Sequence, residues 1–389
     1  MKKALSLLLA LALSLSCTAC SGDSKTQGGK ADNGSTAAAS AGKSGEAENG
    51  TPQYSVTFLC MTLGDMSFAD SGKRGLDMLE EKYGFKTKAV EAGTDSSKYE
   101  SYVIDVCEGE PDFVLSTSEF QEEVERAAKD YPDIRFIIFD VSRDVEVKSD
   151  NILYIAYAQN EGSYLVGMIA AAMSKNGVIG TVGGVQNPVI CDFITGYAEG
   201  ARAYNPDIKV ITSWVGNWTD SAKMLELCSQ QNSTYGADVF FPVAGGASLG
   251  AFEAALKTPG TWSIGVDSDQ HAIFEATGNA YADVIVTSML KQVDKSFVSV
   301  FEDYLGGEDY WGTVRVLGVK AGGVDYVNDE MLKENAPAEV IAQVEEAKQK
   351  IIDGELTVKG YKDFANEEEY NAYINTFAPV SYTHLTLPT

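Results

Sequence analysis

The sequence is poor in histidine and in basic residues. Its 389 residues include two His, at positions 271 and 384, and 30 Lys and Arg against 56 Asp and Glu. The formal net charge is therefore −26 at pH 7. Such an acidic chain lacks the basic footprint that nucleic acid requires and is not attracted to anionic lipid. Two His also leave no material for a His-rich metal site, so we expect neither nucleic acid nor metal as a partner.

Common catalytic motifs are missing as well. The chain has no phosphate-binding G-x-x-x-x-G-K-[ST] loop, and none of its four cysteines beyond position 53 lies in a C-x-x-C pair. The glycines of 179–184 follow a predicted strand but do not spell a dinucleotide fingerprint. His271 follows the acidic run 267–270, where a carboxylate could tune it as a base, but no matched nucleophile is visible. We predict a protein that is not an enzyme and uses no cofactor.

No hydrophobic run is long enough to span a bilayer comfortably. Lys2 and Lys3 precede an apolar run over 4–15, which is typical of a secretion signal. Small residues then lead into Cys20, a pattern that resembles the lipobox of bacterial lipoproteins. The resemblance implies that 1–19 is a signal peptide and that Cys20 is acylated. Cys17, or an ordinary secretory signal with incidental cysteines, is the alternative.

A polar segment follows the signal. Residues 20–53 contain no aromatic side chain and are rich in Gly, Ser and Ala, so they predict a flexible linker with an r.m.s. span of roughly 30 Å. A lipid, a linker and a globular body predict a protein anchored to the cell membrane by lipid alone, facing the extracellular or periplasmic side. The remaining cysteines lie in apolar patterns and predict small buried side chains, with disulfides as the alternative: Cys60, Cys107, Cys191 and Cys228.

From position 54 the chain alternates strand and helix patterns. Strands are predicted at 54–61, 112–115, 135–140, 151–157, 178–182, 208–215, 238–241, 262–266 and 282–286. Helices are predicted at 67–83, 120–131, 161–175, 188–204, 219–233, 249–256 and 288–304. This alternation is typical of parallel α/β sheets covered on both faces, and the number of strands favours two Rossmann-like lobes with a ligand in the cleft between them. We expect lobe 1 at 54–157 with a return of 288–322, lobe 2 at 158–287 and a helical extension at 323–379.

Several strand ends carry recognisable motifs in a fixed order. They are Asp65–Phe68, Tyr131–Asp140, Glu161–Gly167, Phe241–Gly246, Ile264–Gln270 and Thr287–Lys291. With these motifs the chain resembles the basic membrane protein (BMP) family of bacterial lipoproteins over about 54–360. The family comprises purine nucleoside receptors of ABC transporters, so the resemblance implies a type I periplasmic-binding-protein fold. It also implies a nucleoside ligand, ABC permease and ATPase partners, and a monomer.

The resemblance assigns roles to individual residues. Phe68 matches a stacking Phe, and Trp218 stands where the family usually has Phe, so the two rings would hold a base between them. Asp267 and Lys291 match the ribose-binding acid and base, and Asp140 matches an acid that accepts from ring N–H groups. Gly245 would let the backbone approach the ligand. Each residue also has an ordinary structural explanation. Phe68 could be a hydrophobic contact at a helix start and Trp218 a core or hinge aromatic. Asp140 and Asp267 could cap a turn and a helix, Lys291 could lie on a solvated helix face, and Gly245 could form a tight turn.

Two departures from the family pattern stand out. An Asn that usually follows the stacking Phe is Ala69 here, and Asp70 could substitute for it and favour N–H donors such as the guanine edge. A sugar or autoinducer receptor, or less readily a nucleoside-processing enzyme, therefore stays open. The tail 380–389 breaks the acidic helical pattern before it and resembles a translated sequencing-adapter artefact.

Overall fold

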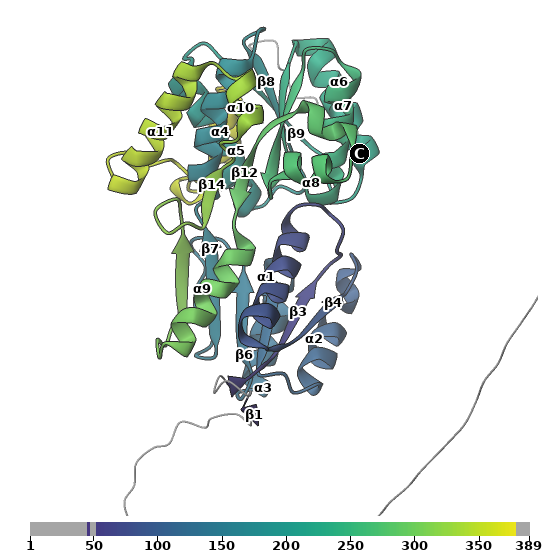
Figure 1. Ribbon diagram of the computed structural model, residues 1–389, viewed down its shortest axis with the longest axis vertical. Coiled ribbons are helices and arrows are strands. Elements are labelled where there is room, and N and C mark those ends of the chain that lie inside the picture. Colours follow the sequence, from purple (N-terminus) through teal and green to yellow (C-terminus); the bar gives the residue numbers. More distant parts are fainter. Residues whose placement is uncertain (1–44, 47–51, 379–389) are drawn as a thin grey trace, which may run out of the picture. The chain divides into compact units, whose positions relative to one another are not determined.

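The computed structural model describes residues 45–46 and 52–378 (Figure 1). The predicted signal peptide, Cys20, most of the linker and the tail 380–389 lie outside these residues. Within the predicted linker, the two-residue strands β1 (Gly45–Glu46) and β2 (Pro52–Gln53) pair antiparallel. The remaining described residues build two six-stranded sheets, each forming the centre of one lobe.

The first sheet is entirely parallel, in the order β13-β7-β6-β5-β3-β4. Its strands are β3 (Ser55–Cys60), β4 (Lys86–Glu91), β5 (Phe113–Thr117), β6 (Arg135–Phe139), β7 (Ile152–Tyr157) and β13 (Thr313–Leu317). Helices α1 (Phe68–Tyr83) and α9 (Val293–Leu305) bury apolar side chains against one face, while α2 (Tyr99–Glu108) and α3 (Gln121–Asp130) cover the other. The fully buried strands explain the continuous apolar runs in the sequence.

The second sheet has the order β14-β12-β11-β10-β8-β9, with only β14 antiparallel. Its strands are β8 (Val178–Gly183), β9 (Lys209–Trp214), β10 (Val239–Val243), β11 (Trp262–Asp267), β12 (Ile285–Lys291) and β14 (Val324–Tyr326). Helices α4 (Gln159–Met173) and α5 (Pro188–Tyr204) lie on one face, and α6 (Ser221–Gln230) and α7 (Leu249–Lys257) on the other. Short α8 (Gln270–Ala276) follows β11.

The chain passes between the lobes three times. It crosses from β7 to α4, from β12 to α9, and from β13 to β14. The predicted two-lobed α/β architecture with parallel sheets is therefore confirmed. After the last crossing come α10 (Glu330–Asn335), α11 (Ala338–Asp353) and α12 (Glu367–Asn375), which form the helical part of the segment expected at 323–379.

The second crossing differs in detail from the sequence prediction. A strand at 282–286 and a helix at 288–304 were expected, but 280–284 form a short 3₁₀ helix, and β12 runs on to Lys291 before α9 begins. Residues 288–291 therefore belong to the second sheet, so the prediction that Lys291 lies on a helix is wrong. Strand β4 was not predicted, and for α2 the sequence indicated only a helical pattern around Cys107, without bounds.

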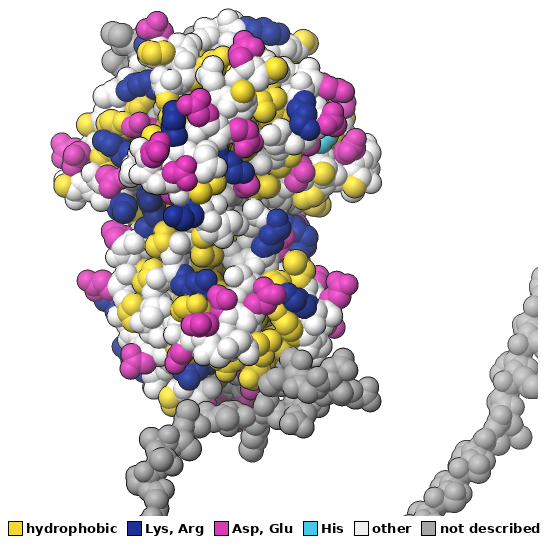
Figure 2. Space-filling view, turned by 60° about the vertical axis from the view of Figure 1, so that its left-hand side comes forward, with side chains coloured by type: hydrophobic (Ala, Val, Ile, Leu, Met, Phe, Trp, Pro, Cys, Tyr) yellow, Lys and Arg dark blue, Asp and Glu magenta, His cyan; other side chains and the backbone are white. Residues whose placement is uncertain are grey.

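Acidic and basic side chains are scattered over both lobes on the face shown in Figure 2. On that face the basic side chains do not merge into one continuous area. On this face the charges of both signs are therefore interspersed.

Candidate ligand-binding site

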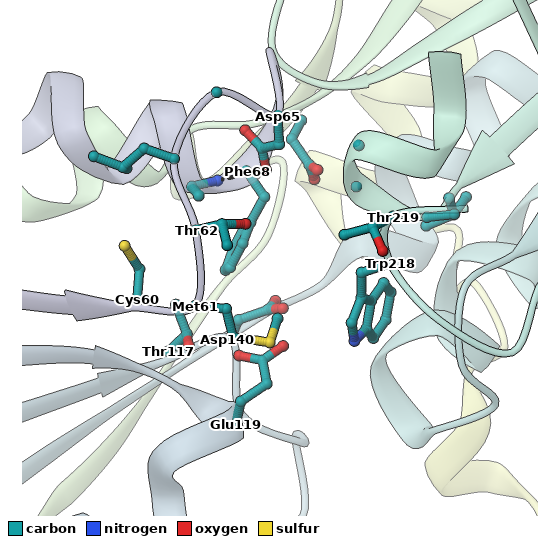
Figure 3. Close-up of a pocket in the computed structure, with 18 of the residues that line it drawn as sticks. Cys60, Met61, Thr62, Asp65, Phe68, Thr117, Glu119, Asp140, Trp218 and Thr219 are labelled. Atoms are coloured by element: carbon teal, nitrogen blue, oxygen red, sulfur yellow. Dashed lines mark hydrogen bonds between the residues drawn. The ribbon is translucent and has the colours of Figure 1, made fainter. Parts of the chain in front are cut away.

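A cavity of about 340 Å³ lies where strand ends of both sheets meet, which is the usual size of a small-molecule site. Strands β3, β5 and β6 of the first sheet and β10, β11 and β12 of the second all end at its wall. The predicted residues that line it are Phe68, Asp140, Trp218, Gly245, Asp267 and Lys291. The two sheets thus direct side chains far apart in the sequence into one cavity (Figure 3).

Two aromatic side chains face each other across the cavity. Phe68 begins α1, and its ring packs on Phe139 with centroids 5.5 Å apart. Trp218 follows β9 on the opposite wall (Figure 3). Gly184 makes room for the indole, because a Cβ at this position would overlap the Trp218 ring. Flat rings on opposite walls can stack on both faces of a planar ligand.

Asp267 provides a buried acceptor in this cavity. Asp267 is the last residue of β11 and is only 8% exposed. Oδ2 lies 2.8 Å from the Ser67 hydroxyl, whereas Oδ1 is buried without a hydrogen-bond partner among the described residues. Burial raises the pKa of this carboxyl to about 6, while the Lys291 ammonium and the Ser67 hydroxyl oppose the rise. An unpartnered buried carboxylate oxygen is a ready acceptor for ligand hydroxyl groups.

Lys291 is the buried cation of the site. It is 2% exposed, and its Nζ pairs with Oδ1 of Asp140 at 2.5 Å. The ammonium also lies over three aromatic rings, 5.2 Å from Phe68, 5.5 Å from Tyr157 and 4.6 Å from Phe193. The rings and the carboxylate together compensate the buried charge. The expected Asp267–Lys291 pair is thus present in the cavity, but the direct ion pair of Lys291 is with Asp140.

Gly245 lies on the wall opposite the first lobe. Its φ of +54° is in the left-handed region, and the nearest atom to a built Cβ would be the Trp218 carbonyl oxygen at 3.6 Å. The position is therefore open towards the cavity, and its backbone is accessible to a ligand.

Asp70, which the sequence offered as a substitute for the missing amide, is directed away from the cavity. Its carboxylate accepts hydrogen bonds from the backbone N–H groups of Gly64 (2.8 Å) and Met66 (2.9 Å), and it does not line the cavity. Asp70 lies one residue beyond Ala69 in the first turn of α1, so its side chain turns back onto the preceding loop. Ala69 itself lines the cavity where the family pattern has an amide.

Sequence reasoning missed two acids of the cavity wall, Asp65 and Glu119. Asp65 accepts N–H bonds from Ser67 and Ala69 at 2.9 Å each, so it caps the start of α1. Glu119 lies two residues beyond Thr117, the last residue of β5. Its position just after a predicted strand is the signal that could have found it, since parallel strand ends meet at one edge of a sheet.

The remaining predictions concern groups outside the cavity. His271 Nδ1 lies 3.0 Å from the Ala282 carbonyl oxygen and is not part of the wall. The four cysteines that the structure describes are buried and free, which confirms that interpretation. No group of three or more His, Cys, Asp or Glu in the described part of the chain could hold a metal ion. Across 45–46 and 52–378, no helix is both long and apolar enough to cross a bilayer.

Two lobes, three crossings and a cavity between the strand ends of both sheets define the class of two-lobed ligand-binding proteins. A family model for PnrA-like ABC transporter substrate-binding proteins (Bmp) matches residues 55–362. The chain therefore belongs to this family, and the resemblance seen in its motifs over about 54–360 is confirmed.

Individual relatives agree with this assignment. The chain is 30% identical over 336 residues to a CD4+ T-cell-stimulating antigen of Listeria innocua, covering 81% of this chain and 90% of that protein. It is 32% identical over 247 residues to the ABC transporter nucleoside-binding protein BmpA of Lactococcus lactis, covering 61% and 68%. An ABC transporter solute-binding protein from Aeropyrum pernix K1 shares the fold, with a TM-score of 0.72, 23% identity and coverage of 83% and 97%. The expected type I periplasmic-binding fold is thereby confirmed.

Proposed function

We propose that the protein captures nucleosides, in particular purine nucleosides, and delivers them to an ABC importer. The observation that carries this proposal is the combination of two facing aromatic rings with the buried, unpartnered Oδ1 of Asp267 in one cavity. A flat base fits between Phe68 and Trp218, and each such stacking contact contributes about 1–3 kcal/mol. The vicinal hydroxyls of a ribose supply the donors that Asp267 lacks.

The nucleoside specificity is also supported by a relative. The Lactococcus lactis protein is named for nucleoside binding, and its match includes much of this chain. The family assignment supports an ABC permease and an ATPase as partners. Ligand between the lobes would stabilise a closed form, which the permease recognises.

The remaining parts of the proposal come from the sequence. Cys20 would carry the lipid that holds a monomeric binding protein outside the membrane, with 20–53 as its linker. The protein would perform no reaction and need no cofactor, because binding and release alone accomplish capture.

Calorimetric titration tests the proposal. The full chain, unfolded and refolded to remove bound ligand, is titrated with guanosine, inosine, adenosine, cytidine and ribose. We expect submicromolar binding of purine nucleosides and far weaker binding of ribose. Asp267→Asn should lower the affinity for ribonucleosides about 10- to 100-fold, since one hydrogen bond to a charged group is lost. Asn tolerates the left-handed backbone at this position, so the variant keeps the fold.

A second ligand series tests whether the loss of affinity in Asp267→Asn depends on the ribose hydroxyl groups. Wild type and Asp267→Asn should bind 2′,3′-dideoxynucleosides equally, because these lack the hydroxyls that Asp267 accepts from. Asp269→Asn is the matched control: Asp269 caps α8 by accepting from the Ala272 N–H at 3.0 Å, and Asn caps equally well. If the folded wild type bound none of the nucleosides, the proposal would be refuted. Binding of a free sugar instead would support the sugar-receptor alternative.

A further inference from the structure

The cavity contains two acidic side chains that the family resemblance does not assign, Asp65 and Glu119. Glu119 lies on a short 3₁₀ turn directly after β5. Figure 3 shows its carboxyl group directed toward Asp140, on the side of the cavity that faces Trp218. Glu119 therefore reaches the space between the walls that carry Phe68 and Trp218 (Figure 3).

Glu119 shares with Asp267 a carboxylate oxygen that no group engages, and differs in this from Asp65 and Asp140. Oε2 is buried and has no hydrogen-bond partner among the described residues. Asp65 is engaged by backbone N–H groups, and Asp140 by Lys291. Burial raises the pKa of Glu119 above its ordinary value, while the neighbouring Thr117 side chain opposes the rise. A buried acceptor of this kind is completed by a ligand that brings donors.

The geometry of a carboxylate restricts which base can be that ligand. An ionised carboxylate only accepts hydrogen bonds, and its two oxygens lie side by side. It therefore matches two adjacent N–H donors. Guanine presents such a pair, its ring N1–H beside the 2-amino group. Adenine and cytosine place an N–H donor next to a ring-nitrogen lone pair, hypoxanthine lacks the amino group, and uracil flanks its single N–H with two carbonyls.

We propose that Glu119 determines base specificity, and that the preferred ligand is a guanine nucleoside whose N1–H and 2-amino groups both donate to this carboxylate. The inference rests on the proposed nucleoside function and makes it more specific. Phe68 and Trp218 then provide stacking for any base, whereas Glu119 selects among bases. The preference for N–H donors that the sequence suggested for Asp70 belongs to Glu119.

The test compares Glu119→Gln with wild type by titration of the full chain with guanosine, inosine and adenosine. Wild type should bind guanosine about 10- to 100-fold more tightly than inosine, which lacks one of the two donors. In Glu119→Gln the amide has one acceptor and one donor. Guanosine binding should fall about 10- to 100-fold, whereas adenosine, which offers one donor and one acceptor, should bind more tightly than to wild type. A misfolded variant cannot gain affinity, so this exchange of preference separates specificity from damage.

Glu122→Gln is the matched control, because this glutamate lies three residues further on with a side chain that is 87% exposed. It should leave all three affinities unchanged. An unchanged guanosine-to-inosine ratio in Glu119→Gln, with nucleosides still bound, would overturn the role of Glu119 and leave the proposed function standing. Failure of folded wild type to bind any nucleoside would overturn both.

Discussion

Asp140 and Asp267 occupy corresponding positions at the strand ends of the two lobes. Asp140 follows β6 with φ +65°, and Asp267 ends β11 with φ +64°, so both lie in the left-handed region that non-glycine residues rarely adopt. Such a conformation costs on the order of 1–3 kcal/mol and persists where the surrounding structure fixes it. In both lobes it directs a carboxylate into the cavity, where Lys291 and Ser67 engage one oxygen of each. In both lobes the strained backbone conformation is therefore found at an aspartate whose carboxylate is directed into the cavity.

The pKa of Asp267 predicts how binding depends on pH. The pKa of about 6 in the folded protein lies above the ordinary value of 3.8, so in the ligand-free state this group favours folding most at low pH, and that contribution is lost as pH rises through 6. Ribose hydroxyls donate to the ionised form. Affinity for ribonucleosides should therefore fall about tenfold between pH 7.5 and pH 5, where most of the carboxyl is protonated.

Titration calorimetry at the two pH values checks this expectation. Asp267→Asn has no titrating group at this position. The part of the pH dependence of affinity that comes from the hydrogen bonds to ribose should therefore be absent in this variant. An equally steep fall in wild type and variant would assign the pH dependence to another group of the cavity.

At the scale of single elements, the sequence predicted those strands and helices whose limits are marked by local chemistry. Helix α5 was predicted at its observed bounds, with Pro188 in its first turn. The structure adds that Asn187 caps this helix by accepting from the Ile190 N–H. Helix α9 was predicted too early, since the apolar run through 288–291 suits a buried strand as well as a helix. Lys291 then lies at a strand end, which only the pairing of β12 with β11 and β14 decides.

Individual site residues show the same limit. Stacking and ribose candidates could be named from motifs, and the structure brings them together in the cavity. Asp70 could not be placed from sequence, because its side chain can be directed either into the cavity or towards the backbone N–H groups of its own loop. In the structure it accepts hydrogen bonds from that loop. Glu119 has no motif around it, and its unpartnered oxygen appears only when β5 is packed beside β6.

Helices α4 and α5 cross so closely that their glycines have no room for a side chain. A Cβ at Gly200 would overlap the Tyr164 carbonyl oxygen, and one at Gly196 the Asn160 carbonyl oxygen. These neighbours are backbone atoms, which cannot rotate away. Close contact of the two helices therefore depends on glycine at these positions.

Gly200→Ala should lower the free energy of unfolding by about 1–2 kcal/mol. Overpacking typically costs 1–3 kcal/mol, and the helix-propensity gain of Ala offsets only about 0.5–1 kcal/mol of it. Chemical denaturation followed by circular dichroism measures the loss. An unchanged unfolding midpoint would show that α4 and α5 can separate without cost.

For the whole molecule, direct bonds already join the two lobes at the rim of the cavity. The Ser268 hydroxyl donates to the Ser67 carbonyl oxygen at 2.9 Å and accepts from Arg74 at 2.9 Å, while Gln270 donates to the Met66 carbonyl oxygen at 3.1 Å. Near the first crossing, Arg143 makes a bidentate pair with Asp192, at 2.9 and 2.8 Å. Opening about the crossings must break the rim bonds, so they contribute to the balance between open and closed forms.

Ser268→Ala should shift ligand-free protein towards the open form without altering the cavity wall. We expect a larger radius of gyration by small-angle X-ray scattering in the absence of ligand, which saturating nucleoside restores. Affinity should fall several-fold, because part of the binding energy is spent on closure. Ser97→Ala, which removes only a local bond to Asp95 on an exposed turn, is the control. Equal radii for both ligand-free variants would contradict the role of the rim bonds.

The threefold passage of the chain between the lobes also determines the order in which the protein can fold. Strand β7 ends at residue 157, but its partner β13 is not synthesised until residues 313–317. The edge of β7 therefore stays unpaired while nearly all of the second lobe is made, and that lobe in turn waits for β14. Neither lobe can be completed during synthesis before the other is almost finished. Such pairings between distant segments make folding slow and expose the nascent chain to aggregation, so this architecture favours chaperone protection until the last strands are in place.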